Sequence, residues 1–159
     1  MRKTVTAMMV AAVAVTGAAA SADAANKKQK VDPEEAIKYR QHVMTAVGGH
    51  TKAVAQIVKG KVPVPHHLGG HAKALVDMSR TTLELFPKGT GPDAGDTKAK
   101  AEIWEDWKDF RKKAEAFNKA AVNLVKAARS NNPKTVKKAT KKLGDSCENC
   151  HDDYKKEDD

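Results

Sequence analysis

Residues 133–154 of this 159-residue chain read PKTVKKATKKLGDSCENCHDDY, and the stretch contains both of the chain's cysteines. Its apolar and small side chains recur every three or four residues, at Val136, Thr140, Leu143, Cys147, Cys150 and Tyr154. Positions at that spacing share one face of an α-helix. We therefore predict a helix over about residues 133–156, with Pro133 in its first turn and both cysteines on its inward face.

The same periodicity recurs in three earlier segments, with approximate bounds of 33–60, 65–86 and 97–129. Asp32 and Pro33 suit the cap and first turn of the first segment, and Pro87 ends the second. No alternating β-type pattern competes with these stripes. We predict an all-α fold, an antiparallel up-down-up-down four-helix bundle, as one domain over residues 25–159. Two Trp, two Tyr and three Phe are few for its core, so either Ala, Leu and Val fill the interior or a non-protein group does.

The N-terminal segment predicts export. Two basic residues precede an apolar run over residues 8–20 that is short for a bilayer span, and residues 22–24 form a small-x-small cleavage pattern. An uncleaved membrane anchor is the alternative. We expect a secretory signal peptide over residues 1–24, cleaved near Ala24, and a periplasmic protein without a stable membrane anchor.

The sequence Cys147-Glu148-Asn149-Cys150-His151 has the C-x-x-C-H spacing that attaches c-type haem. On a helix these side chains share a face, so both thiols can form thioethers with the haem vinyl groups while His151 reaches the iron. Three alternatives fit the sequence less well. A disulfide between cysteines this close would be strained, a thioredoxin-like pair needs a βαβ context, and a zinc site lacks a second cysteine pair. We predict one covalent haem c, attached through Cys147 and Cys150, with His151 as the proximal iron ligand.

The chain after the leader resembles a class II cytochrome c, the cytochrome c′ family. The resemblance rests on the haem motif near the C-terminus, on Tyr39-Arg40-Gln41 with Met44, and on Gly95-Asp96 ahead of Glu102-Ile103-Trp104. All c-type cytochromes share the haem motif, whereas its C-terminal position and the first-helix pattern indicate this class. The resemblance covers essentially the whole mature chain and implies a helical bundle around a single haem.

Met44 decides which kind of family member is predicted. At about 1.5 Å per helical residue, Met44, Trp104 and His151 fall at similar depths in the bundle, and Gly48 would leave clearance for a flat macrocycle one turn beyond Met44. In the family Met44 stands at the distal haem position, where a coordinating methionine implies a low-spin iron suited to electron transfer. We predict an electron carrier with His151 and Met44 as axial ligands. The alternative is a five-coordinate member that binds nitric oxide or carbon monoxide while Met44 only packs nearby.

Three further residues are candidates for contact with the haem. Arg40 is charged on the buried stripe of the first helix, where it either extends to solvent or, as the resemblance supports, contacts a haem propionate. Trp104 and Phe86 are expected to form walls of the pocket. Similar proteins often have arginine four residues after the haem histidine, where this chain has Lys155, and a lysine supplies only a point charge on that side.

The other histidines predict no definite site. His67 and His71 are one helical turn apart with His66 beside them, a set that copper or zinc could use. We prefer a solvated helix face there, because no third ligand is evident. His42 and His50 receive the same interpretation.

The formal net charge of +9 has two interpretations. Lysine-rich faces either keep the bundle soluble or attract a redox partner with an acidic surface. Nucleic acid is not an expected partner, because the chain is exported and its basic residues lack interleaved aromatic side chains. No nucleophile–base pair or paired-carboxylate site stands out, so no enzymatic activity is expected. Family members are often dimers through their first two helices, which leaves a homodimer open.

Overall fold

The structure is a computed structural model that describes residues 31–157. The predicted signal peptide lies outside the described residues. Five α-helices make up most of the described chain: α1 (Pro33–Val58), α2 (Leu68–Arg80), α3 (Glu102–Glu105), α4 (Trp107–Arg129) and α5 (Pro133–Tyr154). Short 3-10 helical turns at Pro65–His67, Thr82–Leu85 and Pro92–Ala94 lie in the connections.

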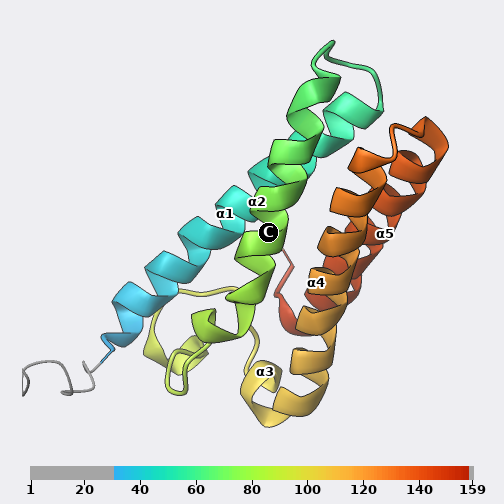
Figure 1. Cartoon of the computed structure of the whole chain (residues 1–159). Helices are drawn as coiled ribbons and strands as arrows, with labels where there is room; N and C mark the ends of the chain where they lie inside the picture. Colours follow the sequence, from blue (N-terminus) through green and yellow to red (C-terminus); the bar gives the residue numbers. More distant parts are fainter. Residues whose placement is uncertain (1–30, 158–159) are drawn as a thin grey trace, which may run out of the picture. The chain divides into compact units, whose positions relative to one another are not determined.

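The four long helices form a bundle (Figure 1). Helix α2 packs against α1 and α4, and α5 packs against α4 and α1, so each long helix has two neighbours in a closed ring. This arrangement confirms the predicted all-α four-helix bundle. Within residues 31–157 the β-type pairing is limited to one isolated bridge between Ala99 and Lys155. No helix in that range is long and apolar enough to cross a membrane.

Side-chain caps fix where the long helices begin. The Asp32 carboxylate accepts hydrogen bonds from the backbone N–H groups of Glu34 at 2.9 Å and Glu35 at 3.2 Å, as its position before Pro33 predicted. Asn132 caps α5 in the same way, and Asp106 accepts the N–H of Asp109 at the start of α4. Each cap satisfies N–H groups that have no partner within the helix.

Two of the predicted helices were too long. The segment 65–86 contains α2 flanked by 3-10 turns, and the segment 97–129 contains the single turn α3 and then α4. The chain bends at Asp106, whose φ of −114° and ψ of 61° lie outside the helical region. The apolar stripe is therefore real, but only part of it is helical.

Contacts with α5 explain why the chain over 97–101 is not helical. The N–H of Lys100 donates to the carbonyl of Tyr154 at 3.0 Å, and the N–H of Lys156 donates to the carbonyl of Lys98 at 2.8 Å. These bonds use the backbone of residues 98–100 to hold the end of α5. Tertiary hydrogen bonds have overridden the local helical preference, which is worth less than about 1 kcal/mol per residue.

The buried side chains form two separate groups. The first, which we call the closed cluster, comprises Val54, Leu68, Ala72, Leu75, Val76, Phe117, Ala120, Ala121, Leu124, Ala127, Val136, Ala139 and Leu143. The second, which we call the aromatic cluster, comprises Leu85, Phe86, Ile103, Phe110 and Tyr154. Its rings meet edge to face: the centroid of Phe110 lies 4.8 Å from that of Phe86 and 5.3 Å from that of Tyr154.

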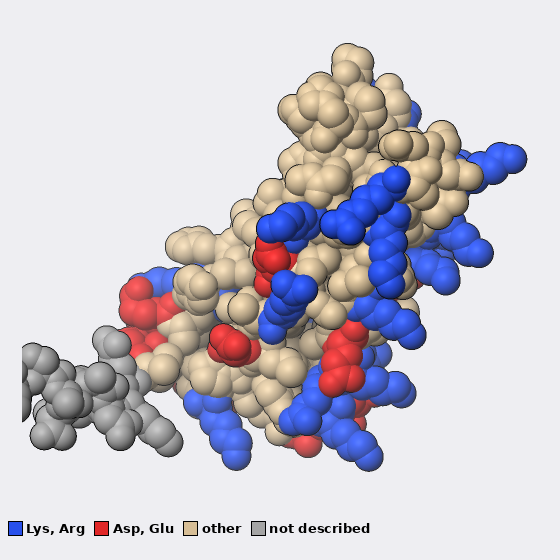
Figure 2. Space-filling view, viewed as in Figure 1, with Lys and Arg blue, Asp and Glu red and all other residues tan. Residues whose placement is uncertain are grey.

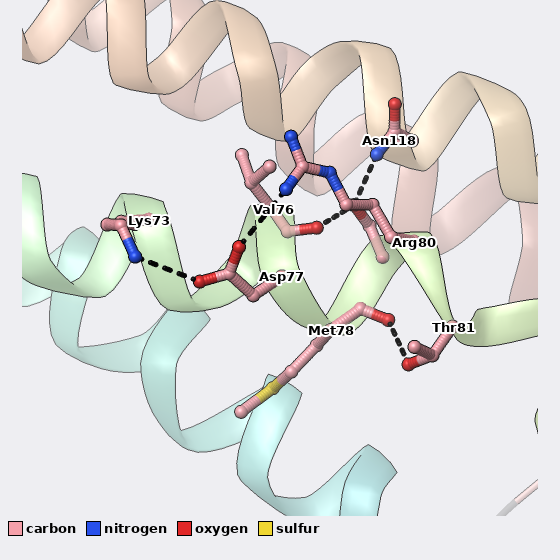
Figure 3. Close-up of polar contacts among 8 residues, drawn as sticks. Lys73, Val76, Asp77, Met78, Arg80, Thr81 and Asn118 are labelled. Carbon is pink, nitrogen blue, oxygen red and sulfur yellow. Dashed lines mark hydrogen bonds and ion pairs between the residues drawn. The ribbon is translucent and has the colours of Figure 1, made fainter.

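A polar contact joins α2 to α4 beside the closed cluster. The Asn118 side chain points from α4 toward α2 (Figure 3), where its amide nitrogen donates to Ser79 Oγ at 2.7 Å. Ser79 in turn donates to the carbonyl of Val76 at 2.7 Å. The exposed face of α2 carries only local ion pairs, such as the one between Arg80 and Asp77 at 3.4 Å (Figure 3). The partly buried amide therefore links the two helices, whereas the surface ion pairs stay within α2.

Candidate functional site

A cavity of about 710 Å³ opens between α1, α5 and the chain around residues 96–99. Its volume falls in the range typical of cofactor and small-molecule pockets. Four aromatic-cluster residues line it, Phe86, Ile103, Phe110 and Tyr154, whereas no residue of the closed cluster does. The cavity is thus the place where the core of the bundle is left incomplete.

Helix α5 brings the haem motif to this cavity. Cys150 and His151 line it, while Cys147 lies one turn earlier, partly buried against the closed cluster. Both cysteines are free thiols, so the disulfide alternative does not hold. Burial raises the pKa of the Cys147 thiol, and it raises that of Cys150 to about 11. Both thiols therefore ionise less readily than an exposed cysteine.

Helix α1 supplies the other wall. Met44 is partly buried and lines the same cavity as His151, which agrees with the depths predicted from helix geometry. Gly48 and Gly49 line the cavity beyond it, and a Cβ atom built on either would meet no other atom within 4 Å. The α1 side of the cavity therefore includes the Met44 thioether and the backbone of Gly48 and Gly49, which leaves space for a flat group.

Arg40 is buried, so the interpretation that it extends to solvent is wrong. Its Nη1 donates to the carbonyl of Leu85 at 3.3 Å and to Thr90 Oγ1 at 3.1 Å, and its Nη2 donates to the carbonyl of Thr90 at 3.0 Å and to Thr97 Oγ1 at 2.9 Å. The guanidinium also lies 4.9 Å from the centroid of the Phe86 ring. Burial lowers the pKa of Arg40, although the group stays charged at any ordinary pH.

These bonds change what can be expected of Arg40 toward a haem propionate. They account for every N–H of the two terminal nitrogens, so a propionate contact would fall to the remaining Nε–H. The neighbouring Gln41 also holds this loop, because its amide nitrogen donates to the carbonyl of Asp96 at 3.0 Å. The contact between Arg40 and a propionate stays a prediction, whereas its role in fixing the loop over 85–97 is evident.

Trp104 does not form a wall of the cavity, which corrects the prediction. Its indole N–H donates to the carbonyls of Phe86 at 3.2 Å and Pro87 at 3.1 Å, and its ring packs against Gly91. The ring lies behind Phe86, with 6.2 Å between their centroids, and Phe86 itself lines the cavity as expected. The partly buried indole N–H needs a hydrogen-bond partner, and the loop carbonyls of Phe86 and Pro87 supply it.

The end of α5 is anchored by contacts that the sequence did not reveal. Lys113 of α4 forms an ion pair with Asp153 at 2.6 Å and donates to the carbonyl of Asn149 at 3.0 Å. The hydrogen bond from Lys113 to Asp153 raises the pKa of Lys113. The Tyr154 hydroxyl donates to Asp109 at 3.1 Å. These bonds flank Cys150 and His151 on both sides and restrict the position of that turn.

Charged side chains surround the cavity mouth. Lys52, Lys98 and Lys155 line it together with Asp96. Lys155, which stands where similar proteins often have arginine, therefore lies at the cavity as a cation, without the planar fork of a guanidinium. The excess of positive charge suits a group that carries carboxylates toward solvent.

The predicted solvated helix face holds for His42, His66 and His67, which are exposed, but not for His50 and His71, which are partly buried. His71 pairs with His50 of α1, with 2.8 Å between their Nδ1 atoms, whereas His66 and His67 stack edge to face at 4.3 Å between centroids. Across residues 31–157, no three side chains of His, Cys, Asp or Glu come together as a metal site. The sequence could not indicate this pair, because 21 residues separate its members.

A family model described as Cytochrome C' matches residues 35–155, nearly the whole described chain. The chain belongs to the cytochrome c′ family. Cytochrome c′ of Rhodospirillum rubrum is 32% identical over 148 residues, which cover 93% of this chain and 96% of that protein. Cytochrome c′ of Alcaligenes xylosoxydans xylosoxydans is 34% identical over 128 residues, covering 80% and 98%. A protein named cytochrome c-554 from Cereibacter sphaeroides is 28% identical and covers 79% of this chain and 83% of its own.

Solved structures of cytochrome c′ agree with the fold. A nitric oxide complex of a cytochrome c prime variant from Alcaligenes xylosoxidans matches with a TM-score of 0.72 at 31% identity, covering 80% of this chain and 98% of its own. The recombinant native protein from the same organism also matches with a TM-score of 0.72, at 32% identity and the same coverage.

Members of the cytochrome c′ family bind covalent haem c, and the features of this cavity fit that group. Two free thiols lie one helical turn apart beside an imidazole, at the edge of a cavity walled by aromatic and aliphatic side chains. The chain is accordingly a monohaem cytochrome with haem c and iron as its cofactor. His151 as proximal ligand and Met44 as distal ligand stay predictions at the level of single residues.

Proposed function

We propose that this cytochrome is a periplasmic gas-binding protein whose iron keeps one axial position open to nitric oxide or carbon monoxide. The observation that carries the proposal is the α1 wall of the cavity, where Gly48 and Gly49 leave open space beyond Met44. The family supports it as well: several of the chain's relatives are named cytochrome c′, and one solved relative is a nitric oxide complex. The sequence also allows this function, and the comparisons favour it over the electron carrier.

Each residue has a definite part in this proposal. Cys147 and Cys150 would hold the porphyrin by two thioethers, and His151 would bind the iron. Haem iron supplies the site at which a small diatomic ligand binds. Phe86, Ile103 and Phe110 exclude water from the buried part of the cavity, and Met44 limits the room available to the bound gas.

The experiment is a carbon monoxide titration of the reduced protein, followed by absorption spectroscopy. We expect a high-spin spectrum that changes on addition of carbon monoxide. Met44→Leu is the matched variant, because leucine has nearly the same volume and no sulfur. If Met44 only packs nearby, the ligand-free spectrum of Met44→Leu should match that of the unsubstituted protein. A low-spin, unresponsive wild-type spectrum would refute the proposal.

The second candidate is the electron carrier with Met44 on the iron. One observation favours it: the Met44 thioether and the His151 imidazole line the same cavity, and methionine plus histidine is an established axial pair in cytochromes. The same titration separates the candidates. A carrier would show sharp low-spin bands, no response to carbon monoxide, and conversion to a responsive high-spin form in Met44→Leu.

Location and partners belong to the proposal too. We propose export through the predicted leader at residues 1–24, without a membrane anchor, and no enzymatic activity or nucleic-acid binding of the protein's own. Lys and Arg side chains gather where α4 and α5 lie (Figure 2), and α5 alone exposes Lys134, Lys137, Lys138, Lys141 and Lys142. This basic surface would attract a redox partner with an acidic surface, with a strong dependence on ionic strength.

A further inference from the structure

The two histidines that meet between α1 and α2 have no part in the haem cavity. His50 and His71 are each partly buried, their ring centroids are 5.1 Å apart, and their Nδ1 atoms are 2.8 Å apart. Neither residue lines the cavity. The pair therefore stands apart from the cofactor and from the function proposed above.

The short distance between the nitrogens has a definite protonation requirement. One Nδ1 must carry a proton and donate it, while the other must be neutral and accept. Each ring can instead carry its proton on Nε2, which leaves two unprotonated Nδ1 atoms 2.8 Å apart. In that tautomeric state the two nitrogens have no proton between them and can share a cation.

We propose that His50 and His71 bind a divalent copper ion through their Nδ1 atoms. Two nitrogens at about 2.0 Å from a metal lie about 2.8 Å apart when they occupy neighbouring corners of a square, and about 3.3 Å apart in a tetrahedron. The observed 2.8 Å matches the square arrangement, which Cu(II) prefers and zinc does not. Cu(II) also binds nitrogen ligands most strongly among the divalent first-row metals.

Both histidines are preceded by glycines, and the two remaining ligands of the copper would be water. The histidines end two copies of the same tripeptide, Gly48-Gly49-His50 on α1 and Gly69-Gly70-His71 on α2. A Cβ atom built on any of these glycines would meet nothing within 4 Å. No side chain from these positions crowds the pair, and the α1–α2 packing holds the two rings in place before the metal arrives.

The test is a titration of the haem-loaded protein with copper(II) chloride, by isothermal calorimetry and electron paramagnetic resonance. The haem-loaded protein is used because thioether formation removes the two cysteine thiols, which would otherwise compete for copper. We expect one tight site per chain and a copper signal split by two nitrogens. His50→Gln and His71→Gln should each weaken binding by at least about tenfold.

The matched control is His67→Gln, because His67 lies just before α2, one turn ahead of His71, and could form an alternative pair with it. Retention of tight binding in this variant supports the site between the helices. If binding is lost in His67→Gln and His71→Gln but kept in His50→Gln, the proposed site is wrong and the copper binds to His67 and His71. Equal copper binding by all three variants and the wild type, or no nitrogen splitting in the wild type, would leave only a hydrogen-bonded pair. Helical circular dichroism and the haem spectrum check that each variant is folded.

Discussion

The closed cluster and the aromatic cluster fill the same bundle in different ways. The closed cluster joins α1, α2, α4 and α5 mostly through small and branched side chains, with Phe117 as its one aromatic residue, and Leu75, Leu124 and Leu143 have no exposed surface at all. The aromatic cluster surrounds a cavity of about 710 Å³ instead of filling it. Close packing stabilises the first group by itself, whereas the second keeps apolar surface that only a bound group can cover.

Hydrogen bonds compensate for the missing packing at the cavity end. Arg40 bonds to three residues of the loop over 85–97, and Lys113 and Asp153 anchor the end of α5. Five of the chain's seven aromatic side chains also lie in or against the aromatic cluster: Phe86, Phe110, Tyr154, Trp104 and Trp107. The interior is therefore filled mainly by Ala, Leu and Val at one end of the bundle and left open for a non-protein group at the other end, so both explanations for the few aromatic residues apply.

Removing the haem should produce the largest difference in stability between the regions around the two clusters. In Cys147→Ser/Cys150→Ser no covalent haem is retained, so the cavity walls lose their principal contact. We expect backbone amides over residues 82–110 and in the last turns of α5 to exchange at least about a hundredfold faster, while those of the closed cluster keep most of their protection. Hydrogen exchange with mass spectrometry measures this.

The control for that experiment is the unsubstituted chain produced without haem attachment, which keeps both thiols. It should exchange like the double variant, which would show that the haem and not the serines is responsible. Uniform loss of protection across the whole bundle would contradict the separation into two independent halves.

Deleting the same side chain from each half sharpens the comparison. Leu124→Ala in the closed cluster and Leu85→Ala in the aromatic cluster should each lower the free energy of unfolding of the haem-loaded protein by about 2–5 kcal/mol. In the haem-free protein Leu124→Ala should cost the same, but Leu85→Ala less than about 1 kcal/mol, because its surroundings are already loosened. Denaturant unfolding followed by circular dichroism gives both values. Equal costs in the haem-free protein would refute the argument.

The sequence predicts the helices around the closed cluster better than the surroundings of the cavity, for a physical reason. Helical stripes and caps such as Asp32 act within a few residues, so the bundle and its haem motif are visible in the sequence. Arg40, by contrast, finds its partners 45 to 57 residues away, at loop positions 85, 90 and 97. The non-helical path of the chain over 97–101 also depends on backbone bonds to the end of α5. Such contacts exist only once the chain is folded.

Replacing Arg40 by lysine tests the hydrogen-bonded loop. Lysine keeps the charge but cannot reach the four acceptor positions with a planar fork, so some buried oxygens lose their partners. We expect Arg40→Lys to lower the free energy of unfolding by about 1–3 kcal/mol. Arg80→Lys is the control, because the Arg80 side chain is 66% exposed and its pairing with Asp77 contributes little. An equally small effect at both positions would mean that Arg40 is not needed to fix the loop.

The smallest effect concerns Tyr154, whose pKa is raised from 10.0 to about 12 by burial and by its hydrogen bond to Asp109. Because the folded pKa exceeds the unfolded one, the phenol contributes stability that is fully present below about pH 10 and is lost as the pH rises toward 12. Tyr154→Phe should cost about 0.5–1.5 kcal/mol near neutral pH through the lost hydrogen bond. It should also abolish this part of the alkaline decline.

Tyr39→Phe provides the matched control, since Tyr39 is 64% exposed and is the chain's other tyrosine. In that variant Tyr154 is the one phenol left, so NMR of isotope-labelled tyrosine ring carbons reports its titration alone. Lys113 also has a raised pKa and loses its ion pair with Asp153 at alkaline pH, but both variants keep that ion pair, so most of its contribution cancels from their difference. If the stability of the two variants falls in parallel between pH 10 and 12, the bond from Tyr154 to Asp109 does not anchor the haem-bearing end of α5.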